Sequence, residues 1–265
     1  MTRSPGSRLL TEQPTTALPG LLGEHSVVVM PTGSIEAHGP HLPLSTDLLT
    51  AEAVAAAAVA GAVAAGVDAW LLPALAYTKS DEHHWAPGTL WVSHGTLMDT
   101  LVELGAGLAH SGVTRLVFFN GHGGNSALLQ VASRELRRRF GLRTFVMHAL
   151  VPPDQGGDSA AGELGLGVHG GLVETSVVLH LRPELVDMST AVRSVPEHLT
   201  RYQHVGFGKR ISFGWLSDDF GPSGVIGDPT GASAELGAGY FDAAVSAAVA
   251  GLAEVAVFDP APPAA

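Results

Sequence analysis

A short polar segment of the chain carries four side chains that can bind a metal ion. The segment follows an apolar run at residues 26–31, which is typical of a buried strand, and the four side chains are Glu36, His38, His41 and Asp47. Glu36 and His38 are two residues apart, so on an extended chain both side chains leave the same face. Carboxylate oxygens and imidazole nitrogens together suit zinc or manganese. The segment therefore predicts a metal site directly after a strand.

A second polar segment, Asn120–Asn125, follows another apolar run and opens a predicted helix. In open α/β sheets, ligands bind at the carboxyl ends of the strands. The glycines of this segment let the backbone bend and approach a ligand, and we expect His122 to project into the same crevice as the first segment. Taken alone, the segment is also compatible with a tight turn and a solvated histidine.

A third segment places His169 and Glu174 around the start of a predicted helix. If the helix begins at Gly170, both side chains reach a common crevice; a helix-capping region with an acid near the positive end of the dipole is the alternative. Three carboxylates, Glu36, Asp47 and Glu174, would balance two divalent cations and a bridging hydroxide. Such a two-metal site activates water and polarises a carbonyl, and a nearby unligated histidine can carry a proton to a leaving nitrogen.

Other polar residues near these segments are candidates for substrate contacts. Glu82 and His83 lie in a loop predicted after the second strand, so they border the same crevice unless the loop is simply hydrated. His41 is expected either to support a metal ligand or to contact the substrate. We predict substrate contacts from five residues: His41, Glu82, His83, Gly123 and Asn125.

Apolar strand-like runs alternate with helical patterns along the chain. Strands are predicted at residues 26–31, 68–76, 114–119 and 144–148, and helices at residues 48–65, 94–110, 125–139, 170–181 and 232–258. Gly141 is the predicted C-cap of the third helix. Residues 152–167 are expected to form a loop, and residues 190–223 an irregular excursion near the site or at a subunit contact. The alternation predicts an α/β fold, with a mainly parallel sheet in a three-layer α/β/α arrangement.

The composition limits the class of protein. The 265 residues are 46% hydrophobic and 15% charged, which allows a sizeable core, and we predict one α/β domain at residues 20–258 between a flexible segment, 1–19, and a disordered tail, 259–265. The net charge of −11 without a basic stripe argues against nucleic-acid binding. There are no cysteines, so any metal must be bound by His, Asp and Glu.

Neither a signal peptide nor a membrane span is predicted. The N-terminus lacks the apolar run of a signal peptide. The apolar segment at residues 51–67 is shorter than a typical span of about 20 residues and is better interpreted as a core helix. We therefore expect a cytoplasmic protein that does not contact a membrane.

The polar segments together resemble the creatininase (creatinine amidohydrolase) family. The resemblance rests on Gly33–Asp47, Asn120–Asn125 and His169–Ser176, and it extends to Glu82–Thr89 and Gly224–Pro229. It implies a creatininase-like α/β/α fold, a binuclear centre of zinc or manganese, with iron as a further candidate, and hydrolysis of C–N bonds other than ordinary peptide bonds. It also implies a homohexamer, because family members are commonly trimers of dimers.

The resemblance assigns roles to individual residues. Four residues match metal ligands of the family: Glu36, His38, Asp47 and His122. Asp47 matches the ligand that bridges both metals, and His169 matches the catalytic histidine that assists proton transfer. Creatininase itself has a glutamate ligand where this chain has Gly124, and we hypothesise that Glu174 takes the place of that carboxylate in the site.

The sequence thus predicts a metal-dependent amidohydrolase that acts on a cyclic amide, lactam or formamide of a small molecule. A metal-bridging hydroxide would attack the carbonyl, and His169 would protonate the leaving nitrogen. Residues 152–167 contain no tryptophan, whereas creatininase closes tryptophans over its small flat substrate, which argues against creatinine as the substrate.

Three other functions stay open. The protein is alternatively a peptidase-like relative that trims a modified peptide, of the mycofactocin-maturation type, or a hydrolase of a cyclic keto-sugar. A non-catalytic metal-binding assembly protein is the candidate from a different class. The intact ligands beside His169 argue against it, because a structural metal site gains nothing from an open position and a poised base.

Overall fold

The computed structural model describes residues 7–153, 157 and 160–261. Its sheet has the order β2-β1-β3-β4, and all neighbouring strands are parallel. The strands are β1 (Val27–Thr32), β2 (Ala69–Leu71), β3 (Arg115–Asn120) and β4 (Arg143–His148). The α-helices are α1 (Leu18–Leu21), α2 (Thr46–Ala64), α3 (His94–His110), α4 (Ser126–Phe140), α5 (Leu172–Leu181) and α6 (Ala234–Val257).

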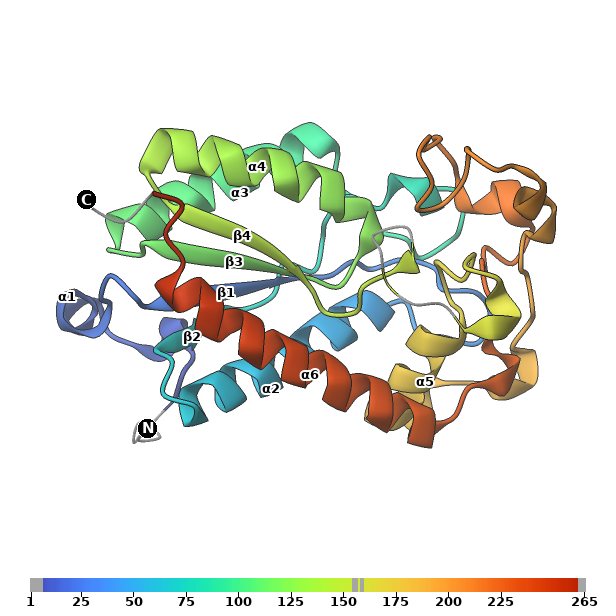
Figure 1. Ribbon diagram of the computed structural model, residues 1–265, viewed down its shortest axis with the longest axis horizontal. Coiled ribbons are helices and arrows are strands. Elements are labelled where there is room, and N and C mark those ends of the chain that lie inside the picture. The colour runs from blue at the N-terminus through green and yellow to red at the C-terminus, as the bar shows by residue number, and fades with distance from the viewer. Residues whose placement is uncertain (1–6, 154–156, 158–159, 262–265) are drawn as a thin grey trace.

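Helices cover both faces of the sheet, as Figure 1 shows. Val27 and Val29 of β1 pack with α2 and α6 on one face, whereas Val28 packs with α3 and α4 on the other. β3 repeats this alternation, as side chains of successive strand residues point to opposite faces. The prediction of an α/β fold with a parallel sheet between helices is confirmed.

The carboxyl ends of β1 and β3 lie side by side. Thr32 pairs with Asn120 in the strand register, and the Thr32 hydroxyl donates a hydrogen bond to Asn120 Oδ1 over 3.1 Å. The chain that follows β2 returns to the same edge, where the Gly33 N–H donates to the Leu75 carbonyl over 3.0 Å. The polar loops that follow these three strands therefore share one region of the molecule.

Some element boundaries differ from the predicted ones. The second strand was expected at residues 68–76 but ends at Leu71, shortly before Pro73, which has no N–H for a ladder hydrogen bond. α5 begins at Leu172 rather than at Gly170, because Gly170 has a left-handed φ of +62°. Gly141 follows α4 with a φ of +73°, so the predicted C-cap is confirmed.

The N-terminal segment predicted to be flexible contacts the sheet in its described part. The Leu71 N–H donates to the Arg8 carbonyl over 2.8 Å, and the Leu10 side chain is buried. Two short 3₁₀ helices, Leu10–Glu12 and Thr15–Ala17, precede α1. Residues 1–6, the tail residues 262–265 and the loop residues 154–156 and 158–159 lie outside the described residues.

α2 contains the apolar segment that we weighed as a membrane span. By length and composition alone, α2 and α6 are each apolar enough to cross a membrane. Ala51, Val54 and Ala58 of α2 are fully buried, and Val54 and Ala58 pack in the apolar cluster on one face of the sheet. The apolar composition of α2 therefore serves the protein core.

The close contact between α5 and α6 depends on a glycine. A Cβ atom at Gly237 would lie 1.8 Å from the Ser176 carbonyl oxygen of α5, whereas a Cβ at Gly239, on the same helix, would meet no atom within 4 Å. We expect Gly237→Ala to lower the free energy of unfolding by about 1–3 kcal/mol through overpacking. Gly239→Ala should stabilise the helix by up to about 1 kcal/mol. Chemical denaturation of both variants tests this, and equal midpoints would contradict the packing argument.

Candidate metal centre

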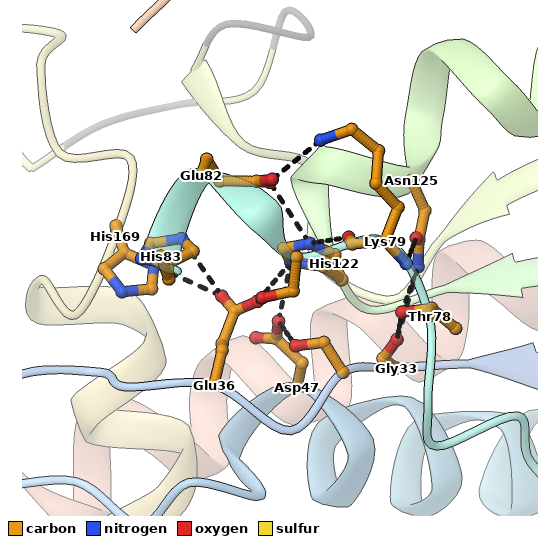
Figure 2. Close-up of polar contacts among 12 residues, drawn as sticks. Gly33, Glu36, Asp47, Thr78, Lys79, Glu82, His83, His122, Asn125 and His169 are labelled. Atoms are coloured by element: carbon orange, nitrogen blue, oxygen red, sulfur yellow. Dashed lines mark hydrogen bonds and ion pairs between the residues drawn. The ribbon is translucent and has the colours of Figure 1, made fainter. Parts of the chain in front are cut away.

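Five segments bring the polar side chains together at the carboxyl edge of the sheet. The loop after β1 carries Glu36 and His38, the first turn of α2 carries Asp47, and the loop after β3 carries His122. A 3₁₀ helix, Asp81–His83, and the start of α5 complete the region. Figure 2 shows Glu36 and Asp47 directed toward His122, with His83 and His169 to one side of Glu36. All four ligands predicted by resemblance are buried.

The Asp47 carboxylate contacts two histidines, one through each oxygen. Oδ1 lies 2.9 Å from His38 Nε2, and Oδ2 lies 2.9 Å from His122 Nδ1. The Ser34 hydroxyl donates to Oδ2 over 2.8 Å and thereby fixes the carboxylate. This geometry gives Asp47 a central place between His38 and His122.

Glu36 lies beside Asp47 and is held by a serine. Its Oε2 accepts a hydrogen bond from the Ser80 hydroxyl over 2.5 Å and lies 3.2 Å from His122 Nδ1. Its Oε1 is buried without a hydrogen-bond partner, 3.4 Å from His83 Nε2 and 3.7 Å from His169 Nδ1. A buried carboxylate oxygen without a donor is costly unless a cation compensates it.

The backbone determines which nitrogen of each histidine faces the carboxylates. His38 Nδ1 lies 3.2 Å from the Glu36 carbonyl oxygen, and His122 Nε2 lies 2.8 Å from the Lys79 carbonyl oxygen. A carbonyl oxygen can only accept, so these nitrogens carry the protons, and the opposite nitrogens present lone pairs to Asp47. Lone pairs and carboxylate oxygens repel at 2.9 Å unless a proton or a metal ion lies between them. The residues present therefore fit divalent metal ions.

The electrostatics of the site also favour positive charge. Burial lowers the pKa of His38, but Asp47, Glu174 and Glu36 together raise this pKa to about 10. The pKa of His122 is likewise raised well above its ordinary value, because Glu36 and Asp47 outweigh the effect of burial. Without metal, the site thus attracts protons to the two histidines, and metal ions compete with these protons.

His169 and Glu174 lie beside His38 at the centre. His169 Nε2 donates to the Ala37 carbonyl over 2.8 Å, so Nδ1 faces the site. Burial, with His83 and His38 nearby, holds the pKa of His169 well below its ordinary value, so this imidazole is neutral. The His169 ring stacks on the His83 ring at 4.1 Å between centroids.

Glu174 lies in the first turn of α5, where its Oε2 accepts the Gly170 N–H over 2.6 Å. Burial is the main reason why the pKa of Glu174 is raised to about 7, and Asp47 and Glu36 add to this against the lowering effect of His38. Ligand atoms of His38, His169 and Glu174 lie within 4.8 Å of one another, as do those of Glu36, Asp47 and His122. These two groups, and a third made of Glu36, His83 and His169, have the residue types and the spacing of a metal site.

The centre opens into a cavity of about 840 Å³. Three of the residues predicted to contact substrate, Glu82, His83 and Gly123, line the cavity, whereas His41 and Asn125 do not. His41 Nε2 instead contacts the Thr175 hydroxyl of α5 over 2.9 Å. The Asn125 amide joins the ends of the strands and donates to Asn120 Oδ1 and to other acceptors nearby.

Four further residues that sequence reasoning passed over take part in the site. They are Ser34 and Ser80, which donate to the two central carboxylates, and Phe213 and Trp215, which line the cavity. Ser34 lies inside the first polar segment, so its position was a usable signal. The others contact the site from distant segments, and no local pattern identifies them.

The chain matches known proteins over most of its length. The family model for creatininase, described as creatinine amidohydrolase, matches residues 12–252. A mycofactocin precursor peptide peptidase of Mycobacterium ulcerans (strain Agy99) is 36% identical over 222 residues, covering 81% of this chain and 79% of that protein. A creatinine amidohydrolase of Pseudomonas putida is 34% identical over 193 residues, covering 66% of this chain and 72% of that protein.

Solved structures agree with these sequence matches. A glutamate-to-glutamine variant of creatininase, described as the Zn-Zn type, superposes with a TM-score of 0.71 at 25% identity. The superposition covers 94% of this chain and 98% of that one. A structure described as creatininase Mn gives a TM-score of 0.69 at 25% identity and covers 94% of this chain and 98% of that one. The family model, the relatives and the fold agree, and the chain belongs to the creatininase family of hydrolases.

Proposed function

We propose that the protein is an amidohydrolase that uses two divalent cations, zinc or manganese, to cleave a C–N bond. The observation that carries this proposal is the pair of histidine nitrogens that face the two oxygens of Asp47 while the outer nitrogens of the same rings contact backbone carbonyls. Five residues would hold the metals: Glu36, His38, Asp47, His122 and Glu174. When bound, two such cations activate water and polarise a carbonyl group.

His169 is suited to move a proton. Its Nε2–H is engaged with the Ala37 carbonyl, which leaves Nδ1 free to accept a proton from the attacking water. The same nitrogen can then pass this proton to the leaving nitrogen of the substrate. Protonated His169 would retain its hydrogen bond to Ala37 and would lie 3.7 Å from the Glu36 carboxylate, which stabilises the added charge.

The shape of the site bears on the choice between two substrate classes. We predicted a small-molecule amide from the sequence, and the reaction chemistry of the site suits such a substrate. The cavity of about 840 Å³ is larger than a small flat ring requires and has apolar walls from Met147, Leu150 and Tyr240. This observation favours a second candidate, the end of a modified peptide, and the peptidase relatives support it.

The first test concerns the metals. Reconstituted protein should hold about two zinc or manganese ions per chain by plasma emission spectrometry, and the added metal should raise the melting temperature because it binds only the folded state. Asp47→Asn should lose most of this metal, whereas Asp99→Asn, an exposed substitution on α3, should keep it. Full activity after removal of all metal, on creatinine or the mycofactocin precursor peptide, would refute the proposal.

A second test concerns His169. We expect His169→Gln to keep its metals but to lose about 100-fold or more of kcat, because a positioned acid–base group contributes this much. Activity is measured on whichever of creatinine and the precursor peptide the wild type cleaves, and metal content on the same sample. A variant that loses metal would show that His169 is a ligand instead.

A third test concerns Glu174. Glu174→Gln keeps the size of the side chain but removes its charge, so one metal per chain should bind at least about 10-fold more weakly. Competition with a zinc chelator measures this affinity. Unchanged metal content together with full activity would exclude Glu174 from the site.

A further inference from the structure

The region behind His122 contains a carboxylate in an unexpected place. Gly124 has no side chain, and a Cβ atom there would lie 1.8 Å from Glu82 Oε1 and 2.5 Å from His122 Nε2. The space into which residue 124 would project is therefore filled by Glu82, which comes from the 3₁₀ helix Asp81–His83. Glu82 therefore occupies the space beside His122 that a side chain at position 124 would need.

Glu82 is held firmly in that position. Its side chain is nearly buried, its Oε2 accepts from Lys79 Nζ over 2.7 Å, and its Oε1 lies 3.3 Å from His122 Nε2. Its backbone carbonyl also accepts from the Ser217 hydroxyl over 3.3 Å. Both carboxylate oxygens thus have partners within the protein, as Figure 2 shows.

The contact reaches the side of His122 that faces away from the centre. The Nε2–H of His122 lies between the Lys79 carbonyl oxygen at 2.8 Å and Glu82 Oε1 at 3.3 Å, while Nδ1 faces Asp47 and Glu36. A carboxylate behind a metal-binding histidine fixes the orientation of the ring and makes its inner nitrogen a more basic metal ligand.

We propose that Glu82 is a positioning residue, which orients His122 toward the metal centre from behind, and that Gly124 is required because it leaves room for this carboxylate. This inference rests on the proposed metal centre. We expected from the sequence that Glu82 contacts the substrate, and the inference instead gives Glu82 the role of holding His122.

The experiment measures zinc affinity by competition with a chromophoric chelator, and the visible spectrum of the Co²⁺-substituted protein. Glu82→Gln should weaken the binding of one metal about 10- to 100-fold and shift the Co²⁺ bands. Gly124→Ala should weaken binding at least as much, because its Cβ displaces the flexible end of Glu82 and also presses on the His122 ring. Asp81→Asn is the matched control: Asp81 also pairs with Lys79 Nζ, at 2.8 Å, but its side chain is exposed, and this variant should bind zinc like the wild type.

A double variant separates positioning from folding. In Glu82→Ala/Gly124→Ala the second substitution should weaken zinc binding less than it does in the wild type, because Glu82 is no longer there to be displaced and only the approach of the new Cβ to His122 remains. Circular dichroism verifies that each variant is folded. Wild-type affinity in Glu82→Gln, or a raised KM with unchanged metal affinity, would overturn the inference in favour of a substrate contact. A wild-type protein that binds no metal would instead refute the proposed function itself.

Discussion

Asp47 places a buried negative charge between the inner nitrogens of two histidines, and the rest of the site depends on this arrangement. Removing a carboxylate from water costs several kcal/mol unless a partner compensates the charge. The backbone carbonyls of Glu36 and Lys79 engage the outer nitrogens of His38 and His122, so these histidines cannot donate to Asp47 without gaining a second proton. The backbone thereby selects cations as the partners of Asp47.

The fold brings Asp47 to this position through two close contacts at glycines. A Cβ at Gly33, which follows β1, would lie 2.4 Å from the Cα of Leu48, and a Cβ at Gly121, which follows β3, would lie 2.6 Å from the Asp47 carbonyl oxygen. Side chains at either position would move the first turn of α2 away from the strand ends. The glycines of the two polar segments are therefore needed for the approach of α2, as much as for the turns themselves.

The sequence predicted the parts of the structure that have a local cause. Continuous apolar runs predicted β1 and β3 as buried strands. The polar residues after these strands led us to expect His38, Asp47 and His122 close together, because parallel strands end at one edge. The length of β2 was overestimated, since a short apolar run does not show where pairing stops.

Contacts between distant segments had no local signal. Ser80 is 44 residues from its partner Glu36, and Glu82 contacts His122 although neither lies in the polar segment of the other. From the sequence, Gly124 of the segment Asn120–Asn125 was interpreted as the loss of a carboxylate that creatininase has at this position. The structure shows that the space beside it is filled from another loop, which only the folded chain can reveal.

The metal centre and the wall of its cavity come from different parts of the chain. The candidate ligands lie on the loops after β1 and β3 and in the first turns of α2 and α5, whereas Phe213 and Trp215 belong to the segment predicted as an excursion near the site. Both rings pack against Phe207, in a small apolar cluster separate from the two clusters beside the sheet. Trp215 also contacts His83 edge to face, with 6.5 Å between ring centroids. The wall can therefore differ in shape and chemistry while the sheet and its loops hold the candidate metal ligands in place.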